Sequence, residues 1–117
     1  MTRQHWRPLF VAAVAVLTAL LLLPGESLPP VTVQDKLAHV LAFGVLAGLA
    51  RRAWPQTPVP VLAIALTTYA LATELLQIAV PGRTFSALDV AADTAGIVGY
   101  FAIAAVAGKG PVSGRTG

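Results

Sequence analysis

Four long apolar stretches follow one another in this chain, and no other feature limits its fold so strongly. They cover residues 6–23, 37–50, 59–80 and 90–107. Their lengths approach the roughly 20 residues that an α-helix needs to cross about 30 Å of hydrocarbon. Together with polar residues at their ends, they predict four transmembrane helices over about residues 6–23, 35–53, 59–80 and 88–107. The expected fold is therefore an all-α integral membrane protein, with the helices in an antiparallel bundle.

The composition leaves little room beside these helices. Hydrophobic residues make up 56% of the 117 residues and charged residues only 11%, with a mean hydropathy of +0.76. A soluble domain is nearer a quarter charged. We expect one four-helix domain over residues 1–108, followed by a disordered tail over 109–117. The absence of cysteine excludes a disulfide framework, a thiolate nucleophile and an iron–sulfur cluster.

The positions of Lys and Arg predict the orientation in the membrane. With a cytoplasmic N-terminus, two basic residues lie outside, Lys36 and Arg83. The other six lie inside, namely Arg3, Arg7, Arg51, Arg52, Lys109 and Arg115. This bias matches the positive-inside rule, so both termini are expected in the cytoplasm. The net charge of +3 then reflects topology, and we expect no nucleic-acid partner. The first stretch runs into Pro24, Gly25 and Glu26 with no A-x-A cleavage pattern there, which indicates an uncleaved signal-anchor helix.

Polar side chains inside the stretches fall at one end of the expected bundle. Consecutive helices cross in opposite directions, so the second and fourth begin on the side where the third ends. The side chains there are Asp35, Lys36, His39, Glu74, Gln77, Asp89 and Asp93. Ionisable groups are costly in hydrocarbon and usually face a bundle interior or a cavity. We expect them to form an outward-facing polar pocket just below the outer surface.

Helical spacing supports a common pocket. Residues three or four apart share a helix face, and there are three such pairs: Asp35 with His39, Glu74 with Gln77, and Asp89 with Asp93. At a rise of 1.5 Å per residue, the three pairs lie at similar distances below the outer ends of their helices, within roughly one helical turn of each other.

Capping and ion pairing offer simpler roles for some of these residues. Asp35 has the residue type of an N-cap for the second helix. The sequence Ser86 to Asp89 has the pattern of a capping box for the fourth. Arg83 is the expected partner of Glu74, or else of Asp93, because its guanidinium can hold a carboxylate bidentately. These roles leave open a purely structural network, with Lys36 reaching the headgroups.

Small residues predict close helix contacts. Gly44 and Gly48 form a GxxxG motif in the second helix. In the fourth helix, Gly96 and Gly99 each lie four residues after an alanine, which gives the same spacing of small residues. Such faces allow helices in lipid to approach closely.

Two catalytic chemistries are alternatives to simple binding. Carboxylates and imidazole suit Zn²⁺ or Mn²⁺, but no HExxH or paired-His spacing is present, so no metal or other cofactor is expected. Alternatively, Asp35 and His39 could act as a general base while Arg83 holds a phosphate. The only nearby hydroxyl nucleophiles would be Thr84 and Ser86. Whether the protein is an enzyme stays open at this point.

Three segments in order resemble the VanZ-like family. The second helix opens with Asp35, Lys36, His39 and Phe43, similar to the family's D-K-x-x-H-x-x-x-F. Glu74, Gln77, Pro81 and Arg83 follow its E-x-x-Q…P-x-R. Its S-x-x-D…N-x-x-G-x-x-G is matched by Ser86, Asp89, Gly96 and Gly99. Asp93 stands where the family usually has Asn, which makes the pocket more negative.

The resemblance implies a small multi-pass protein of the bacterial cytoplasmic membrane. The family takes its name from members linked to low-level resistance to teicoplanin, a lipid-bearing glycopeptide, and it brings no established mechanism. Our leading hypothesis is that the outward pocket binds a cell-envelope ligand, such as a lipid-linked cell-wall precursor or a lipoglycopeptide. The alternatives are a membrane hydrolase or transferase acting on an envelope lipid, and a polar network that only holds the bundle together.

Overall fold

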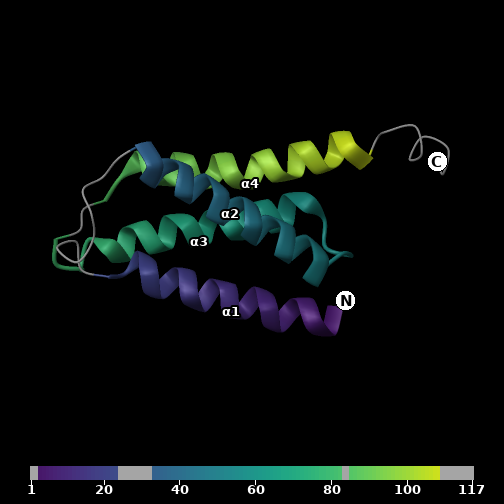
Figure 1. Ribbon diagram of the computed structural model, residues 1–117, viewed down its shortest axis with the longest axis horizontal. Helices are drawn as coiled ribbons and strands as arrows, with labels where there is room; N and C mark the ends of the chain where they lie inside the picture. The colour runs from purple at the N-terminus through teal and green to yellow at the C-terminus, as the bar shows by residue number, and fades with distance from the viewer. Residues whose placement is uncertain (1–2, 24–32, 83–84, 109–117) are drawn as a thin grey trace.

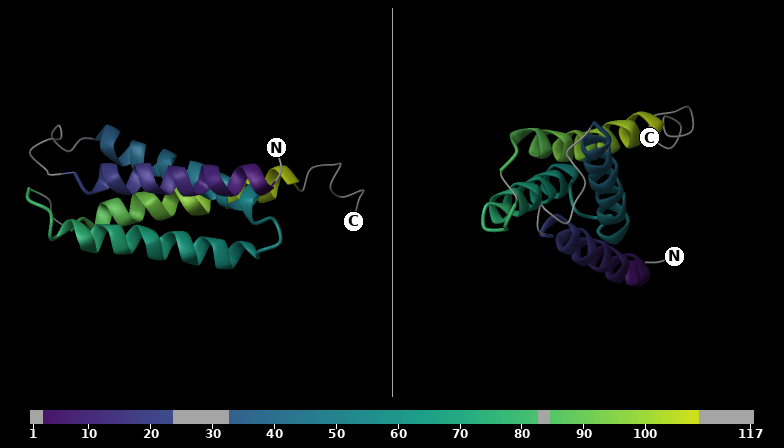
Figure 2. Two further views of the ribbon diagram at one scale, coloured as in Figure 1. Left: turned by 90° about the horizontal axis from the view of Figure 1, so that it is seen from below. Right: turned by 60° about the vertical axis from the view of Figure 1, so that its left-hand side comes forward.

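The computed structural model describes residues 3–23, 33–82 and 85–108, which form four helices and no strand. The helices are α1 (Arg3–Leu21), α2 (Val33–Ala53), α3 (Val59–Gln77) and α4 (Ala87–Gly108). They lie side by side and alternate in direction, so that α2 and α4 begin at the end where α1 and α3 finish (Figure 1). Figure 2 shows the same bundle from below and from near one end. The prediction of an all-α chain with four helices is confirmed, whereas the predicted tail over 109–117 lies outside the described residues.

Several helix ends differ from the sequence expectation by one to three residues, and α1 covers Arg3–Leu21 where residues 6–23 were expected. α2 begins at Val33, so Asp35 lies inside its first turn and is not the N-cap. This corrects the expected capping role. α3 ends at Gln77 because residues 78–82 form turns, and Gly82 adopts a positive φ of 76° that favours glycine. At the other end of α3, Pro58 and Pro60 are tolerated because the first backbone N–H groups of a helix have no internal partner.

Three of the helices are long and apolar enough to cross a membrane: Gln4–Leu21, Val59–Gln77 and Ala87–Ala107. α2 has 21 residues, which corresponds to about 31 Å of helix. It carries Asp35 and Lys36 at its start and Arg51 and Arg52 at its end, and it is not among the three. A crossing by α2 therefore stays a prediction.

The apolar core lies where α2, α3 and α4 meet. Its largest buried side chains are Phe43, Leu46 and Ile97, each at most 2% exposed. α1 packs on the outside of this core through Phe10, Val14 and Leu17, which are only partly buried. Large apolar side chains also cover the outer surface of every helix. Such a surface fits a lipid bilayer, because lipid tails solvate apolar groups as well as a protein core does.

Glycine brings α2 and α4 into close contact. A Cβ added at Gly96 would lie 2.1 Å from the backbone oxygen of Val40, and one added at Gly44 would lie 3.6 Å from the Gly96 oxygen. Gly48 faces the ring of Tyr100, at 3.2 Å from a built Cβ. Gly99 differs from the other three, because no atom lies within 4 Å of a Cβ built there. The crossing of the two helices is thus centred on Gly44 and Gly96.

Aromatic and basic side chains gather at the end of the bundle where α1 begins and α2 ends. The Arg7 guanidinium lies 5.3 Å from the ring centroid of Trp54, and that of Arg52 lies 5.3 Å from the ring centroid of Trp6. Arg7 also donates a hydrogen bond from Nε to the Ala53 oxygen, at 2.9 Å. The two ends of the bundle therefore differ in chemistry, with cations and indoles at one and carboxylates at the other.

Candidate functional site

The polar cluster lies at the end of the bundle where α2 and α4 begin and α3 ends, on the left in Figure 1. α2 supplies Lys36 and His39, α3 supplies Glu74, and α4 supplies Asp89 and Asp93. Side-chain contacts join α2 to α4, and Glu74 of α3 binds the backbone just before α4.

Two parallel contacts bridge α2 and α4. Lys36 Nζ forms an ion pair with Asp89 Oδ1. One turn deeper, His39 Nδ1 and Asp93 Oδ1 share a hydrogen bond of 2.6 Å. The second ring nitrogen of His39, Nε2, lies 3.9 Å from Asp89 Oδ2, so His39 stands between the two carboxylates. The three- and four-residue spacings on the facing helices produce this ladder, since each places two side chains on the same face.

Burial divides the cluster into a rim and a floor. The rim consists of Lys36, His39 and Asp89, whose side chains are 28%, 16% and 15% exposed. The floor consists of Glu74 and Asp93, which are 1% and 0% exposed. A molecule approaching the bundle from this end would therefore meet the rim first.

Glu74 joins the end of α3 to the beginning of α4. Its Oε1 accepts a hydrogen bond from the backbone N–H of Ser86, at 3.0 Å. The Ser86 hydroxyl oxygen in turn accepts from the backbone N–H of Asp89, at 3.2 Å. Half of the expected capping box is therefore present. In a full capping box, the Asp89 carboxylate would accept the hydrogen bond from the Ser86 backbone N–H. That carboxylate pairs with Lys36, and Glu74 accepts this hydrogen bond in its place.

Gln77 serves a different contact from the rest of the predicted pocket. Its side-chain Nε2 donates to the Leu21 oxygen at 2.5 Å, and the residue is 1% exposed. The last carbonyls of a helix lack partners within the helix. Gln77 thus satisfies the end of α1 and ties α3 to it.

One polar atom of the floor lacks a partner. Asp93 Oδ2 is buried and accepts no hydrogen bond from the described part of the chain. Leaving a buried acceptor unpaired is costly, so this oxygen is a strong acceptor for any donor that reaches it. The cluster also carries an excess of acid, with three carboxyl groups against Lys36 and His39. Within residues 3–23, 33–82 and 85–108, no three His, Asp or Glu side chains are arranged to hold a metal ion.

Some of the predicted site residues lie outside this description. Arg83 and Thr84 fall outside the described residues, as does the side chain of Asp35. The expected partnership of Arg83 with Glu74 or Asp93 therefore stays a prediction. His39, which was expected beside Asp35, has Asp93 as its partner on the facing helix.

A second polar contact was missed by sequence reasoning. Thr18 Oγ1 and the Tyr69 hydroxyl lie 2.5 Å apart and join α1 to α3, and both groups also contact the Val14 oxygen. The available signal was the presence of a hydroxyl within each of two apolar stretches. Spacing along the sequence gave no indication that these two would meet.

Comparison with known proteins places the chain in a family. No curated protein and no solved structure matches it. The model of the family VanZ/LLP1, however, matches residues 5–108, a segment that holds almost all of the four helices and every side chain of the cluster. The resemblance seen in the three sequence motifs is thereby confirmed, and the chain belongs to the VanZ/LLP1 family.

Proposed function

We propose that this VanZ-like membrane protein binds a cell-envelope ligand through its polar cluster, at the outer face of the bacterial cytoplasmic membrane. A lipid-linked cell-wall precursor and a lipoglycopeptide such as teicoplanin are the ligand classes that fit. Both combine a lipid part with many hydroxyl, amide or amine groups. A part in glycopeptide resistance would follow from such binding.

The proposed orientation has all four helices crossing the membrane, with the α2–α3 connection in the cytoplasm. The Lys and Arg bias supports it. Because the chain has no cysteine, single cysteines can report the side directly. Both Gln56 in the connection and Leu88 at the start of α4 are exposed. In intact cells, a membrane-impermeant maleimide is expected to label Leu88→Cys and to leave Gln56→Cys unlabelled.

Permeabilised cells provide the control for this experiment. Both cysteines should react once the membrane is opened, which shows that neither is hidden by the fold. Labelling of Gln56→Cys but not of Leu88→Cys in intact cells would reverse the orientation. The ligand would then have to come from the cytoplasmic side.

Asp93 Oδ2, which is buried and has no partner among the described residues, is the observation that carries the binding proposal. A network that served only to hold the helices together would gain stability by satisfying this atom. A hydroxyl, amide or ammonium group of a ligand is the complementary donor. Because the cluster is acid-rich, a donating or cationic group is favoured over an anionic one.

The partly exposed rim supplies the first contacts. Lys36 and Asp89 form an ion pair at the rim. A ligand group of the same charge or polarity can take the place of either partner and bind the other. His39 links the rim to Asp93. Movement of this imidazole would give a ligand donor access to the floor.

A structural network is the second candidate, and the interhelical pairing favours it. Lys36 with Asp89 and His39 with Asp93 connect α2 to α4, and Glu74 of α3 holds Ser86 at the residue before α4. The hydrolase or transferase alternative has weaker support. The Ser86 hydroxyl, its nearest candidate nucleophile, lies in the cap of α4 rather than on the His39 imidazole.

Rim variants separate ligand binding from a structural role. Lys36→Gln and Asp89→Asn keep the size and hydrogen-bonding capacity of each side chain but remove its charge. We expect both variants to melt within a few degrees of wild type, because both side chains are partly exposed and the neutral amide can still hydrogen-bond to the remaining partner. The envelope component that co-purifies with wild type in lipid nanodiscs, identified by mass spectrometry, should be lost from both.

Arg51→Gln is the matched control, because it removes a charge at the opposite end of the bundle, where Arg51 donates to the Thr57 oxygen. It should retain the same bound component as wild type. Unchanged retention by both rim variants would argue against a ligand site at the cluster. A large drop in melting temperature for both would favour the structural network.

A further inference from the structure

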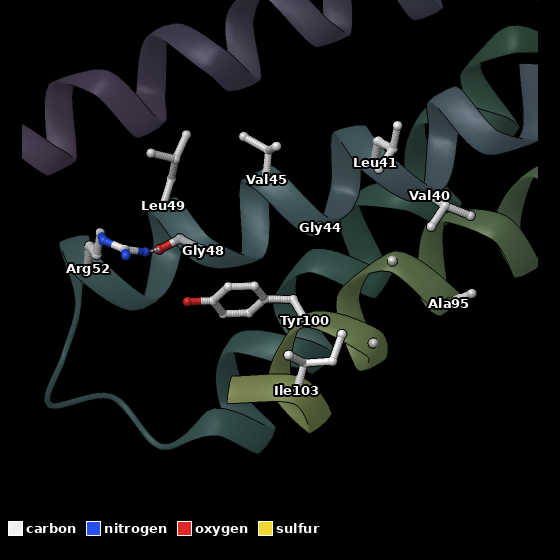
Figure 3. Close-up of a pocket in the computed structure, with 12 residues that line it drawn as sticks. Val40, Leu41, Gly44, Val45, Gly48, Leu49, Arg52, Ala95, Tyr100 and Ile103 are labelled. Atoms are coloured by element: carbon white, nitrogen blue, oxygen red, sulfur yellow. Dashed lines mark hydrogen bonds between the residues drawn. The ribbon is translucent and has the colours of Figure 1, made fainter. Parts of the chain in front are cut away.

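An apolar groove runs along the outside of the bundle between α2 and α4. It encloses about 520 Å³. Gly44, Gly48 and Gly99 contribute to its floor, and Figure 3 shows the side chains that border it. Leu41 and Val45 on α2 are 62% and 60% exposed. An exposed apolar groove of this size calls for an apolar occupant.

Two hydrogen-bond donors stand at one end of the groove. Arg52 lies at the end of α2, where its Nη1 donates to the Gly48 oxygen at 3.4 Å. The Tyr100 side chain extends from α4 toward the same end, with its hydroxyl directed to the Arg52 side (Figure 3). Among the described residues that line the groove none is acidic, so the charge of Arg52 has no counter-ion within it.

We propose that this groove binds one acyl chain of an anionic phospholipid, with the phosphate held by the Arg52 guanidinium and the Tyr100 hydroxyl. Arginine is suited to phosphate because its planar fork donates two parallel hydrogen bonds. The ring of Trp6, on which the guanidinium stacks, holds it at the level where indoles meet lipid headgroups. The groove is thus apolar along most of its length, and the two groups that would bind the phosphate, Arg52 and Tyr100, lie at one end of it.

The length of the groove fits one membrane leaflet. Its lining on α2 extends from Val40 to Arg52, twelve residues further along the helix, which is a rise of about 18 Å. Half of the hydrocarbon core is about 15 Å thick. An acyl chain that starts from a phosphate at Arg52 would therefore end near the middle of the bilayer.

A second copy of the chain fits this surface less well. In a two-fold dimer whose axis runs along the membrane normal, equivalent residues face each other at the same depth. Arg52 of each copy would then lie near its equivalent, and the groove supplies no carboxylate to neutralise them. A transmembrane partner helix would also need a contact surface of about 30 Å, longer than the groove.

A groove between α1 and α2 provides a contrast within the same molecule. It encloses about 440 Å³ and is lined by Leu, Val and Ala side chains with no charged group. Lipid tails can fill it, but nothing there distinguishes one headgroup from another. Headgroup preference is therefore assigned to the α2–α4 groove alone.

Native mass spectrometry of the full chain tests the proposal. The protein is reconstituted in equal amounts of phosphatidylglycerol and phosphatidylcholine with the same acyl chains, extracted in mild detergent, and its retained lipids are counted. Both lipids carry the phosphate, but the choline ammonium of phosphatidylcholine would place a second positive charge near Arg52 and leaves that lipid without net charge. We therefore expect wild type to retain phosphatidylglycerol about tenfold more than phosphatidylcholine. Arg52→Gln should bring this ratio close to one. Gly99→Leu should lower the retention of both lipids, because it fills the groove without meeting another atom at its Cβ.

Two variants control for charge and bulk. Arg51→Gln removes a neighbouring charge outside the groove, and Ala102→Leu introduces the same side chain at an exposed position of α4 that does not line it. Both should behave as wild type. Equal retention of the two lipids by wild type, or an equal loss of preference in Arg51→Gln, would overturn the proposal. So would a dimer that Gly99→Leu dissociates. None of these three results would bear on the polar cluster, which lies at the other end of the bundle.

Discussion

Replacing Gly96 by alanine is expected to unfold or severely loosen the bundle. The added Cβ would lie 2.1 Å from the Val40 oxygen and 3.0 Å from the Gly44 nitrogen, and both are backbone atoms that cannot rotate away. α2 and α4 would have to separate along their length, which would also break the contacts of the polar cluster. We expect a loss of roughly 3 kcal/mol or more, the upper end of the usual cost of overpacking. Thermal unfolding of the purified protein in detergent measures it.

Gly99→Ala is the matched control for this variant. It makes the same chemical change three residues later on the same helix, where no atom lies within 4 Å of the new Cβ. Alanine is the better helix former, by about 1 kcal/mol in soluble helices, so stability should be unchanged or slightly raised. Equal melting temperatures for the Gly96→Ala and Gly99→Ala proteins would contradict the close approach of α2 and α4.

Removing either partner of the His39–Asp93 hydrogen bond is expected to destabilise the protein strongly. Asp93 is fully buried and its Oδ1 lies 2.6 Å from His39 Nδ1. In His39→Leu, the carboxyl group loses its partner while it stays buried, at a cost of about 3 kcal/mol. Asp93→Leu leaves His39 Nδ1 without its hydrogen-bond partner, and only the longer contact of Nε2 with Asp89 remains. The double variant should lose less than the sum of the two single losses, because neither polar group then remains.

The measurement is a double-mutant cycle of unfolding free energies under one set of detergent conditions. Thr94→Val is a suitable control, because the Thr94 hydroxyl donates only to the Val90 oxygen of its own helix at 2.8 Å. Combined with His39→Leu, it should show additive effects. Additive losses for His39→Leu and Asp93→Leu would mean that the two side chains do not interact in the folded protein.

The sequence by itself determined the number of helices, their order, and the end at which the polar residues meet. These properties depend on hydropathy and on the rise per residue, which are local quantities. The family followed from the residues themselves, in the motifs around His39, Glu74 and Asp89. Helix ends were less well predicted, and Asp35 lies within the first turn of α2 instead of capping it. Local preferences at a helix end are weak, and the neighbouring residues can extend the helix by a turn.

Only the tertiary structure decided which polar groups are partners. The spacing allowed His39 to face Asp35, yet its partner on the facing helix is Asp93. The sequence suggested a capping box within α4, yet Glu74 of α3 accepts the Ser86 N–H, and Gln77 binds the Leu21 oxygen of α1. It also gave Gly96 and Gly99 equal weight, whereas only Gly96 lies at the crossing with α2. The reason is that pairing depends on how each helix is rotated and shifted against its neighbours. The packing of the whole bundle fixes those rotations, whereas spacing along one helix fixes only which residues share a face.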